Sequence, residues 1–587
     1  MKPERLDPAL RTALDRLVET RTPEGCWVGR LSSSALSTAT AVSALALAAQ
    51  SEDAARLRAG LAWLARTQNA DGGWGDTPDS PSNLSTALLV SAALKLAPSG
   101  SADVPRAVED RLEAYLSRVA GPSEAQRREA VCAAYAPDRT FAVPILAQLA
   151  LAGAASWSAI PSLPYELAAL PPALFRFLRL HVVSYALPAL IAVGLTLERH
   201  QPPAFLLRRW LRAAARGRAL RKLEEIQPSD GGFLEAVPLT SFVAMSLLPL
   251  YGHTHPVVRK GLAFLRASAR SDGSWPIDTN LSVWLTTAAV TALGETELRG
   301  PGPAAGDRES ATRAWLLAAQ HRRRHPYTDS PPGGWAWTDL PGGVPDADDT
   351  AGAILALKRL QGPDQALEAG VRWLLDLQNA DGGWPTFCRG WGRLPFDRSA
   401  PDLTAHVLRA LKAFDPAGTH PRTRSAVRRG LAYLRDRQRD DGSWIPLWFG
   451  NQAAREHANP VLGTARVLRA LAELEPAGPA ARRGCRYLLG AQNADGGWGG
   501  SAGVASTTEE TALAVSALAT GSGESAVRTA LEKGVLHLVD RVASGAWLTP
   551  SPIGLYFARL WYSEEAYPVI WTVEALGRAS QRMHHAG

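Results

Sequence analysis

The chain has 587 residues, whereas an ordinary domain has about 100–200, so we expect two large domains. Hydrophobic residues make up 46% of it and charged residues 20%, which indicates a large core and excludes a mainly disordered chain. The net charge of +7 comes from interspersed side chains, so it does not by itself indicate a nucleic-acid partner, although it is compatible with a surface facing anionic lipid. The four cysteines lie far apart without a Cys-x-x-Cys pair, which argues against a zinc cluster or a disulfide framework and favours a reducing cytosol.

The start of the chain, Met1-Lys2-Pro3-Glu4-Arg5, lacks the apolar core of a signal peptide. The longest uncharged apolar run covers residues 182–197, which is fewer than the roughly 20 residues that a membrane-spanning helix needs. We therefore expect this run to form a buried helix.

A repeated pattern runs along the chain: a small residue, an aromatic residue, Leu, Gln and then Asp-Gly-x-Trp. The five strong copies are residues 60–74, 261–275, 370–384, 430–444 and 484–498, and the second has Ala269 where Gln is expected. Weaker copies lie at residues 25–27, 227–233 and 534–547. Gly suits the backbone angles of such a turn, the Gln amide can bond free groups at helix ends, and Trp can fill the space between helices. We therefore expect these Gln and Trp residues to be structural.

Helical stretches rich in Ala and Leu separate the turns, whereas the alternating pattern of strands is nearly absent. Examples are residues 84–96, 283–293, 353–360 and 508–518. Helix pairs joined by turns at intervals of tens of residues predict an all-α fold of α/α barrels, in which each repeat supplies one inner and one outer helix.

The acidic cluster Asp346-Ala347-Asp348-Asp349-Thr350 is the strongest candidate for chemistry. Neighbouring anions repel and raise each other's pKa, so one carboxyl should keep its proton, and in a dry site it becomes an aimed proton donor. The alternative is that these carboxylates only stabilise the N-terminus of the helix that follows. Magnesium binding is a further alternative, although we find no second metal-binding motif.

Several segments taken together resemble the squalene-hopene cyclase family of class II terpene cyclases. Besides the Gln-Trp repeats and the acidic cluster, they are Gly333-Gly334-Trp335-Ala336-Trp337, Asp402-Leu403-Thr404-Ala405-His406-Val407, Gly463-Thr464, Tyr562 and Tyr567-Pro568. The resemblance covers most of the chain. It implies two α/α barrels, with a catalytic domain of residues 1–30 and 285–587 split by an inserted barrel of residues 31–284.

The resemblance also implies a reaction. Asp348 would protonate a terminal alkene or epoxide of a linear polyprenoid, with Asp346 and Asp349 holding it in its acidic state, and carbocations would then close a polycyclic, hopene-like product. Squalene is the first candidate substrate; a shorter or longer polyprenoid or a meroterpenoid is the alternative. No metal or other cofactor would be required.

A carbocation needs a dry cavity lined by aromatic faces, which attract cations. The matching motifs place five aromatic residues in candidate lining positions: Trp337, Trp284, Tyr185, Trp498 and Tyr562. For Trp498 a structural role in its turn is an equal alternative.

In the family a His that hydrogen-bonds the acid is expected shortly before the Gln of the last strong repeat, where this chain has Ala491, with Arg486 in place of an acidic neighbour. The partner that recharges the acid must therefore be another residue. Asn459, in Asn459-Pro460-Val461-Leu462-Gly463-Thr464, is the first candidate. His457 is the second, although a surface position is its more common outcome.

Residues 205–222 resemble a helix that lies in a membrane interface. The apolar side chains are Phe205, Leu207, Trp210 and Leu211, and the cations are Arg208, Arg209, Arg212, Arg216, Arg218, Arg221 and Lys222. A solvated face packed on the barrel is the alternative. Because family members are monotopic, the resemblance implies a peripheral enzyme on the cytoplasmic side of the cell membrane, in which a homodimer would be allowed and nucleic acid would not be a partner.

Two other functional classes use related architecture. Protein prenyltransferase subunits need a zinc ion held by Asp, Cys and His, and no suitable trio stands out. A non-catalytic isoprenoid-binding protein could keep the barrel and lose the acid, yet all three Asp residues of the cluster are present.

Overall fold

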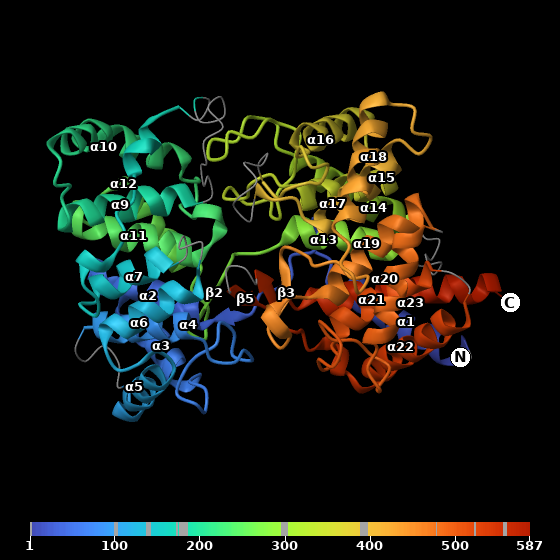
Figure 1. The fold of residues 1–587 in the computed structure, drawn as a ribbon, viewed down its shortest axis with the longest axis horizontal. Helices are drawn as coiled ribbons and strands as arrows, with labels where there is room; N and C mark the ends of the chain where they lie inside the picture. The colour runs from blue at the N-terminus through green and yellow to red at the C-terminus, as the bar shows by residue number, and fades with distance from the viewer. Residues whose placement is uncertain are drawn as a thin grey trace. The chain divides into compact units, whose positions relative to one another are not determined.

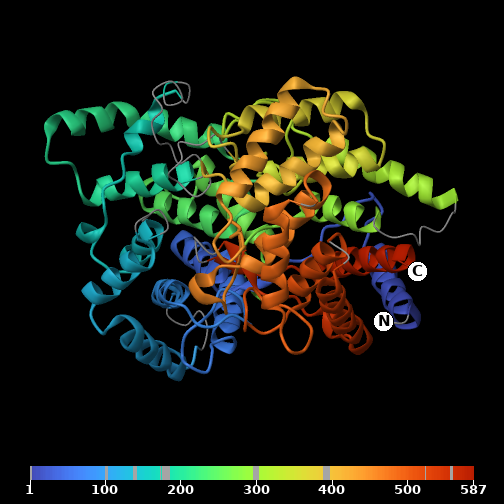
Figure 2. The ribbon, with the colours of Figure 1, turned by 45° about the vertical axis from the view of Figure 1, so that its right-hand side comes forward.

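The computed structural model describes residues 3–98, 104–136, 142–171, 174, 186–294, 303–387, 397–476, 478–521, 524–555 and 560–586. The described chain is mostly helical, as Figures 1 and 2 show. It divides into unit 1, residues 1–30, 280–339 and 344–587, and unit 2, residues 31–279 and 340–343. The sequence analysis placed the junctions at 30 and 285, whereas the structure has them at 30 and 280 and assigns four further residues, 340–343, to unit 2.

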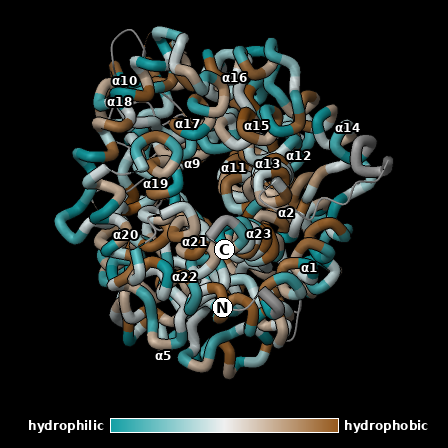
Figure 3. The backbone as a smooth tube through the Cα atoms, turned by 90° about the vertical axis from the view of Figure 1, so that its right-hand side faces the viewer, coloured by the Kyte–Doolittle hydropathy of each residue, from teal (hydrophilic) through white to brown (hydrophobic). Residues whose placement is uncertain are grey.

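In the described part of unit 1, six helices form a closed ring in which each contacts the next and the last contacts the first. They are α13 (Ser282–Gly294), α15 (Ala347–Arg359), α17 (Pro401–Phe414), α19 (Pro460–Leu474), α21 (Thr508–Ala519) and α23 (Ala566–Ala586). The outer helices are α1 (Pro3–Glu19), α14 (Pro303–Ala318), α16 (Asp364–Leu377), α18 (Pro421–Asp436), α20 (Pro479–Ala491) and α22 (Ser525–Ser544). Figure 3 looks along this ring and shows the outer helices around it. The predicted α/α barrel is confirmed.

Unit 2 repeats the arrangement. Its inner helices α2 (Ala35–Ala48), α4 (Leu84–Leu96), α7 (Ala142–Leu151), α9 (Leu187–His200) and α11 (Val237–Tyr251) contact one another in turn, and α11 contacts α2. The outer helices are α3 (Ala54–Arg66), α5 (Arg106–Ala120), α6 (Glu124–Ala134), α10 (Leu206–Ile226) and α12 (Pro256–Ala267). The apolar run at 182–197 continues into α9, which is mostly buried. Across the described ranges, every helix is too short or too polar to cross a membrane.

Short elements complete the two units. The 3-10 helices are η1 (Ser51–Asp53), η2 (Trp157–Ala159), η3 (Tyr165–Ala169), η5 (Phe233–Glu235), η7 (Arg455–His457) and η8 (Ala546–Leu548). Strand β1 (Ser33–Ser34) pairs antiparallel with β2 (Trp275–Pro276). In unit 1, β4 (Ile553–Leu555) lies between β3 (Phe449–Asn451) and β5 (Leu560–Tyr562), both antiparallel to it. This small sheet brings the C-terminal aromatic residues beside the loop that precedes α19.

The Gln-Trp turns tie neighbouring helices together, as predicted. The Gln378 amide donates to the Gly382 carbonyl at 2.7 Å and to the Ala426 carbonyl near the start of α18 at 3.0 Å. The Trp384 side chain is fully buried, and its indole N–H donates to the Leu374 carbonyl of α16 at 2.8 Å. Matching indole bonds come from Trp74, Trp275, Trp444 and Trp498. Their structural role is therefore confirmed.

Residues 340–343 belong to unit 2 because Glu235 holds them. The Gly342 N–H donates to Oε1 of Glu235 at 2.7 Å, and the Thr279 hydroxyl donates to Oε2 at 2.9 Å. Burial, followed by the hydrogen bond and charge of Asp230, raises the pKa of Glu235 to about 9. The loop that leads to the acidic cluster is thus anchored by a carboxyl group that is neutral at pH 7.

Candidate active site

The acidic cluster begins α15, and the preceding Trp turn fixes its position. The Asp346 N–H donates to the Trp335 carbonyl at 3.0 Å, and the Trp335 N–H donates to the Thr350 hydroxyl at 2.9 Å. Asp346 is the N-cap of α15, since its carboxylate accepts from the Asp349 N–H at 2.8 Å. The capping alternative is therefore realised for Asp346, which leaves Asp348 and Asp349 in the first turn of the helix, where its dipole favours negative charge.

Two cationic or ionisable side chains from neighbouring inner helices contact Asp348. His406, in the second turn of α17, places Nδ1 2.6 Å from Oδ1 of Asp348. Arg466, in the second turn of α19, places Nη1 3.4 Å from Oδ2. Asp348 is 7% exposed, so these contacts are formed away from bulk water, where charge interactions are strong.

The predicted partners of the acid are corrected by these contacts. Asn459 is the N-cap of α19: its Oδ1 accepts from the Leu462 N–H at 3.1 Å, and its Nδ2 donates to Glu510 at 3.0 Å. His457 instead pairs its Nδ1 with the Gln452 carbonyl at 3.2 Å. The side chains that contact the acid are His406 and Arg466, because they lie on the barrel interior on neighbouring inner helices.

His406 lies in the segment Asp402–Val407, which is part of the family resemblance. The His that hydrogen-bonds the acid was nevertheless expected at the position of Ala491. The signal that identifies it is the register of the inner helices. In α17, Thr404 accepts the N–H of Trp384 at 3.0 Å, just as Thr350 accepts that of Trp335 in α15. The residue two places after such a Thr points into the barrel, and in α17 that residue is His406.

The protonation of the cluster differs from the prediction. Burial raises the pKa of Asp348, but the charges and hydrogen bonds of His406 and Arg466 outweigh it, so this pKa lies below its ordinary value. Burial raises the pKa of Asp346 to about 7. Burial and the neighbouring Asp346 raise the pKa of Asp349 well above its usual range. The cluster therefore binds a proton more tightly at Asp346 and Asp349 than at Asp348.

A low pKa makes Asp348 a strong acid in the moments when it carries a proton. Its conjugate base is stabilised by Arg466 and by His406, whose own pKa is lowered by burial despite the charge of Asp348. The cost is that the protonated form of Asp348 is scarce at neutral pH. Asp349 is the adjacent group that holds a proton.

Aromatic rings surround the acid and its partners. The ring of Trp284 on α13 lies 6.2 Å from that of His406, edge to face, and 6.0 Å from that of Phe449. The Arg466 guanidinium lies over both Trp284 and Phe449. The structure thus places the predicted lining residue Trp284 beside the acid's partner.

Tyr562 joins the same cluster through Tyr567. The two hydroxyl groups lie 3.3 Å apart, Tyr567 stacks on Trp571 at 4.8 Å, and its ring meets Phe449 edge to face at 6.3 Å. Tyr567 is 2% exposed, so the C-terminal helix contributes an aromatic wall to the barrel interior.

Trp337 belongs to a second aromatic group. Its ring meets Phe387 at 6.2 Å, and Phe387 meets Trp448 at 5.9 Å, both edge to face. The Trp448 indole donates to the Thr386 hydroxyl at 3.0 Å, and the Thr386 carbonyl accepts from the Ala347 N–H at 2.8 Å. This group therefore borders the N-terminus of α15.

Trp498 and Tyr185 are the remaining predicted lining residues. Trp498 is fully buried in the last strong turn, where its indole donates to the Leu488 carbonyl at 2.8 Å, so it has the structural role. Tyr185 lies outside the described residues.

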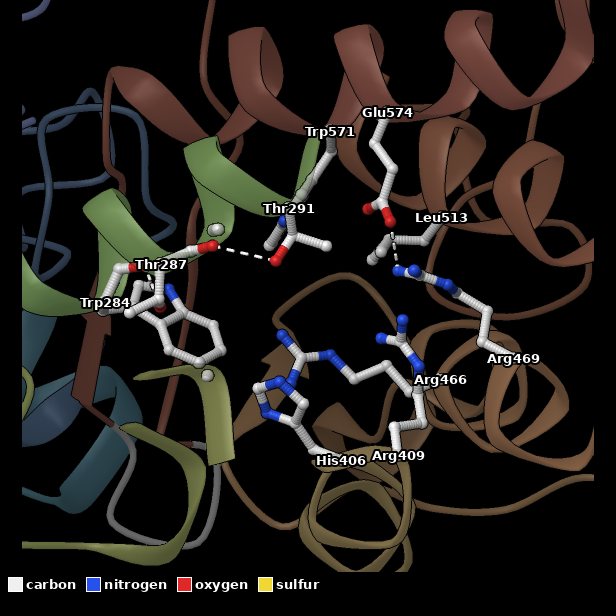
Figure 4. A pocket seen from close by; sticks show the side chains of 12 residues that line it. Trp284, Thr287, Thr291, His406, Arg409, Arg466, Arg469, Leu513, Trp571 and Glu574 are labelled. Atoms are coloured by element: carbon white, nitrogen blue, oxygen red, sulfur yellow. Dashed lines mark hydrogen bonds and ion pairs between the residues drawn. The ribbon is translucent and has the colours of Figure 1, made fainter. Parts of the chain in front are cut away.

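A small cavity of about 70 Å³ lies inside the barrel behind the acid's partners. Figure 4 shows His406, Arg409, Arg466, Arg469 and Glu574 converging on it. Ligand pockets usually measure about 300–1,000 Å³, whereas a single water needs only about 10–15 Å³. The cavity suits a few water molecules and is too small for a polyprenoid.

The carboxylates do not suit a metal ion. Both oxygens of Asp348 face cationic or ionisable nitrogens, and Asp346 caps its helix. In the part of the chain that the structure describes, no group of three His, Cys, Asp or Glu side chains has the arrangement of a metal site. The magnesium alternative therefore has no fitting set of ligands among these residues.

The candidate membrane segment lies on α10 of unit 2. Phe205, Leu207 and Trp210 are 79%, 69% and 67% exposed, and Leu211 is 46% exposed.

The expected orientation of the cations is wrong in part, because Arg212 is 1% exposed and donates to Glu166 at 3.0 Å. Arg208 and Arg216 pair with Glu166 and Glu198, and Lys222 pairs with Glu225. The remaining arginines of the segment, Arg209, Arg218 and Arg221, are exposed.

Comparison with known proteins gives matches along both units. The family model described as the squalene-hopene cyclase C-terminal domain matches residues 281–581, and that of the N-terminal domain matches residues 10–107. The drimenyl diphosphate synthase of Streptantibioticus cattleyicolor is 34% identical over 48% of this chain and 50% of its own length. The squalene–hopene cyclase of Bradyrhizobium diazoefficiens is 26% identical over 88% of this chain and 86% of its own length.

Among solved structures, ent-copalyl diphosphate synthase from Streptomyces platensis superposes with a TM-score of 0.57 at 20% identity, covering 98% of this chain and 100% of that chain. It supports the fold. The matches to the first three curated relatives span only 43–50% of the length of those proteins.

Proposed function

Because the chain belongs to the squalene-hopene cyclase family, we propose that it is a class II terpene cyclase, which protonates a linear polyprenoid and cyclises it through carbocations. One observation carries this proposal. Asp348 is buried in the first turn of an inner barrel helix, with His406 at 2.6 Å and Arg466 at 3.4 Å. These contacts stabilise the carboxylate that remains after a proton has left, which is the condition for a strong carboxylic acid.

The first step moves one proton and one electron pair. The Asp348 hydroxyl proton bonds to the CH carbon of the terminal double bond, whose π electrons form the new C–H bond and leave a tertiary cation. Further double bonds then attack in sequence, and the last cation loses a proton or takes up water. The developing negative charge on Asp348 meets donors that are already in place, so the transition state is stabilised more than the ground state.

Squalene is the first candidate substrate, supported by the squalene–hopene cyclase relative that this chain matches over most of both lengths. A shorter prenyl diphosphate is the second, supported by the drimenyl diphosphate synthase relative. Purified protein should be incubated with squalene, 2,3-oxidosqualene, farnesyl diphosphate and geranylgeranyl diphosphate, and the products identified by mass spectrometry. If Asp348→Asn cyclises a substrate as fast as the parent does, the assignment of the acid is wrong. Binding without turnover of any of them would favour an isoprenoid-binding protein.

We further propose that the start of α10 docks unit 2 on the cytoplasmic face of a membrane. Phe205, Leu206 and Leu207 are 79%, 78% and 69% exposed, and Trp210 and Leu211 extend the same apolar patch. Exposed apolar patches of this kind mark interaction sites, and squalene-like substrates reside in lipid. Each exposed arginine near the surface should add about 1 kcal/mol on anionic lipid, in a salt-dependent manner.

Liposome sedimentation tests the docking surface. The parent should bind anionic liposomes more strongly than neutral ones, with partial release by salt, and Trp210→Glu with Leu211→Glu should reduce binding on both. Leu548→Glu, at an exposed leucine of unit 1, is the matched control and should bind like the parent. Equal binding by the double variant and the parent would place the docking surface elsewhere.

A further inference from the structure

Arg466 lies on α19 beside the acid and is fixed on three sides. Its Nη1 is 3.4 Å from Oδ2 of Asp348. Its central guanidinium carbon lies 5.1 Å from the centre of the Trp284 ring and 5.2 Å from that of Phe449. Aromatic faces attract a cation, and more strongly where water is excluded. The two rings therefore hold the planar group in place, and its direction toward Asp348 does not depend on the ion pair alone.

The titratable and charged groups around Asp348 and Arg466 come from four inner helices. They are Asp346 and Asp349 on α15, Asp402, His406 and Arg409 on α17, Arg469 on α19, and Tyr567 and Glu574 on α23. Helix α13 presents Trp284 and Thr287, which do not titrate.

Two other arginines, Arg409 and Arg469, line the same cavity, and both have carboxylate partners away from the acid. Arg409 donates to Glu473 at 2.7 Å, and Arg469 pairs with Glu574 at 2.5 Å (Figure 4). The arginine paired with the acid itself is Arg466. Its charge is therefore aimed at the reacting carboxyl group, whereas those of Arg409 and Arg469 are compensated deeper in the barrel.

We infer that Arg466 is a positioning residue that sets the strength of the acid and thereby selects an alkene over an epoxide as the group that is protonated. The inference rests on the proposed cyclase function. In this role Arg466 acts on Asp348 and does not contact the substrate.

The two acceptors differ in basicity. An alkene offers a π bond, which breaks as the C–H bond forms. An epoxide offers an oxygen lone pair, so the proton bonds to oxygen and the C–O bond breaks toward the tertiary carbon. The epoxide is the stronger base and reacts with a weaker acid, whereas the alkene rate follows acid strength closely. Loss of Arg466 should therefore slow the protonation of an alkene more than the protonation of an epoxide.

Rate measurements against pH test this selection with squalene and 2,3-oxidosqualene as the probes. In Arg466→Met the charge is lost and much of the length is kept. The alkaline limb of kcat/KM should move up by about one pH unit, because Asp348 then keeps its proton to higher pH. The acidic plateau should fall about tenfold with squalene and less than about threefold with 2,3-oxidosqualene. Arg466→Lys, which retains the charge, should restore part of both changes.

A measurement without substrate separates this inference from the proposed function. Infrared difference spectra against pH report the Asp348 carboxyl group as the signal missing in Asp348→Asn. In Arg466→Met this signal should titrate at higher pH than in the parent. Arg469→Met removes another buried arginine one turn further along α19 and should leave the titration unmoved.

Two outcomes overturn the inference: an unmoved carboxyl titration in Arg466→Met, or equal losses on the alkene and the epoxide with an unmoved alkaline limb. Either would make Arg466 a purely structural residue. If the parent cyclises neither probe, the squalene-type function fails, while the infrared titration still decides whether Arg466 sets the acid.

Discussion

Glu235→Gln should stabilise the protein, and the gain should grow with pH. Glu235 is fully buried, and its pKa is raised from 4.5 to about 9, first by burial and then by Asp230. A raised carboxyl pKa means that the folded state binds a proton that the unfolded state has released. Stability is therefore lost as pH rises from about 4.5 toward 9. Gln carries an uncharged amide of the same shape at every pH, so it avoids this loss.

The magnitude follows from linkage. At pH 7 the unfolded side chain is about 2.5 pH units above its pKa, so keeping Glu235 protonated costs about 3 kcal/mol. For a unit of this size, each kcal/mol shifts the melting temperature by about 2–4 °C. Calorimetry at pH 5 and pH 8 should show nearly equal melting of unit 2 at pH 5 and a clear gain for Glu235→Gln at pH 8.

The matched control for this prediction is Glu225→Gln, at a side chain that is 65% exposed, and it should show no such pH trend. A Gln effect of equal size at pH 5 and pH 8 would refute the reasoning, since it would show that Glu235 does not titrate differently in the folded state.

Three further predictions concern the site and the turns. Asp348→Asn should abolish cyclisation with unchanged circular dichroism, and EDTA should leave the parent's product yield unaltered, because the proposed proton transfer from Asp348 uses no metal. His406→Gln removes the ring nitrogen at 2.6 Å from Asp348, a charge-assisted contact worth about 1.5–3 kcal/mol, so kcat should fall about 10- to 100-fold; an unchanged kcat would contradict the pairing. Trp384→Phe leaves the buried Leu374 carbonyl without its indole donor and should cost about 1–3 kcal/mol in denaturant titrations, with KM unchanged.

Local patterns predicted most of the fold. The helix expected at residues 84–96 is α4 (Leu84–Leu96), and the Gln-Trp turns have the predicted bonds because their geometry depends on a few adjacent residues. At Gly382 the φ is +91°, and a Cβ atom at this position would lie only 2.5 Å from the Arg429 carbonyl oxygen. Only Gly fits there, so the residue type itself predicts the turn.

Contacts between helices were harder to predict. Asn459 was chosen because the resemblance to related cyclases places a partner of the acid at this position. An Asn followed by a Pro is also the pattern of a helix N-cap, which is its role here. Arg212 was counted with the cations expected to face lipid headgroups, but it shares the buried face of α10 with Ala215 and Ala219. In both cases the side chain's surroundings depend on which face meets the barrel, and residue type alone does not show this.

The repeats themselves show which residue of each inner helix faces the barrel interior. In α15, α17, α19 and α21 a Thr accepts the N–H of the preceding turn's Trp: Thr350, Thr404, Thr464 and Thr511. The residues two places later line the cavity in every case: Gly352, His406, Arg466 and Leu513. This position of each repeat therefore contributes one residue to the barrel interior.

The residue two places before this Thr is a buried carboxylate in three of those helices, namely Asp348, Asp402 and Glu509. Burial raises the pKa of Asp402 to about 6 and that of Glu509 to about 7. The same burial acts on Asp348, yet its pKa lies below the ordinary value. Since the three helix starts are equivalent, the difference cannot come from the helix dipole or from burial. It comes from His406 and Arg466, so the strong acid is made by the neighbouring repeats and not by the acidic cluster itself.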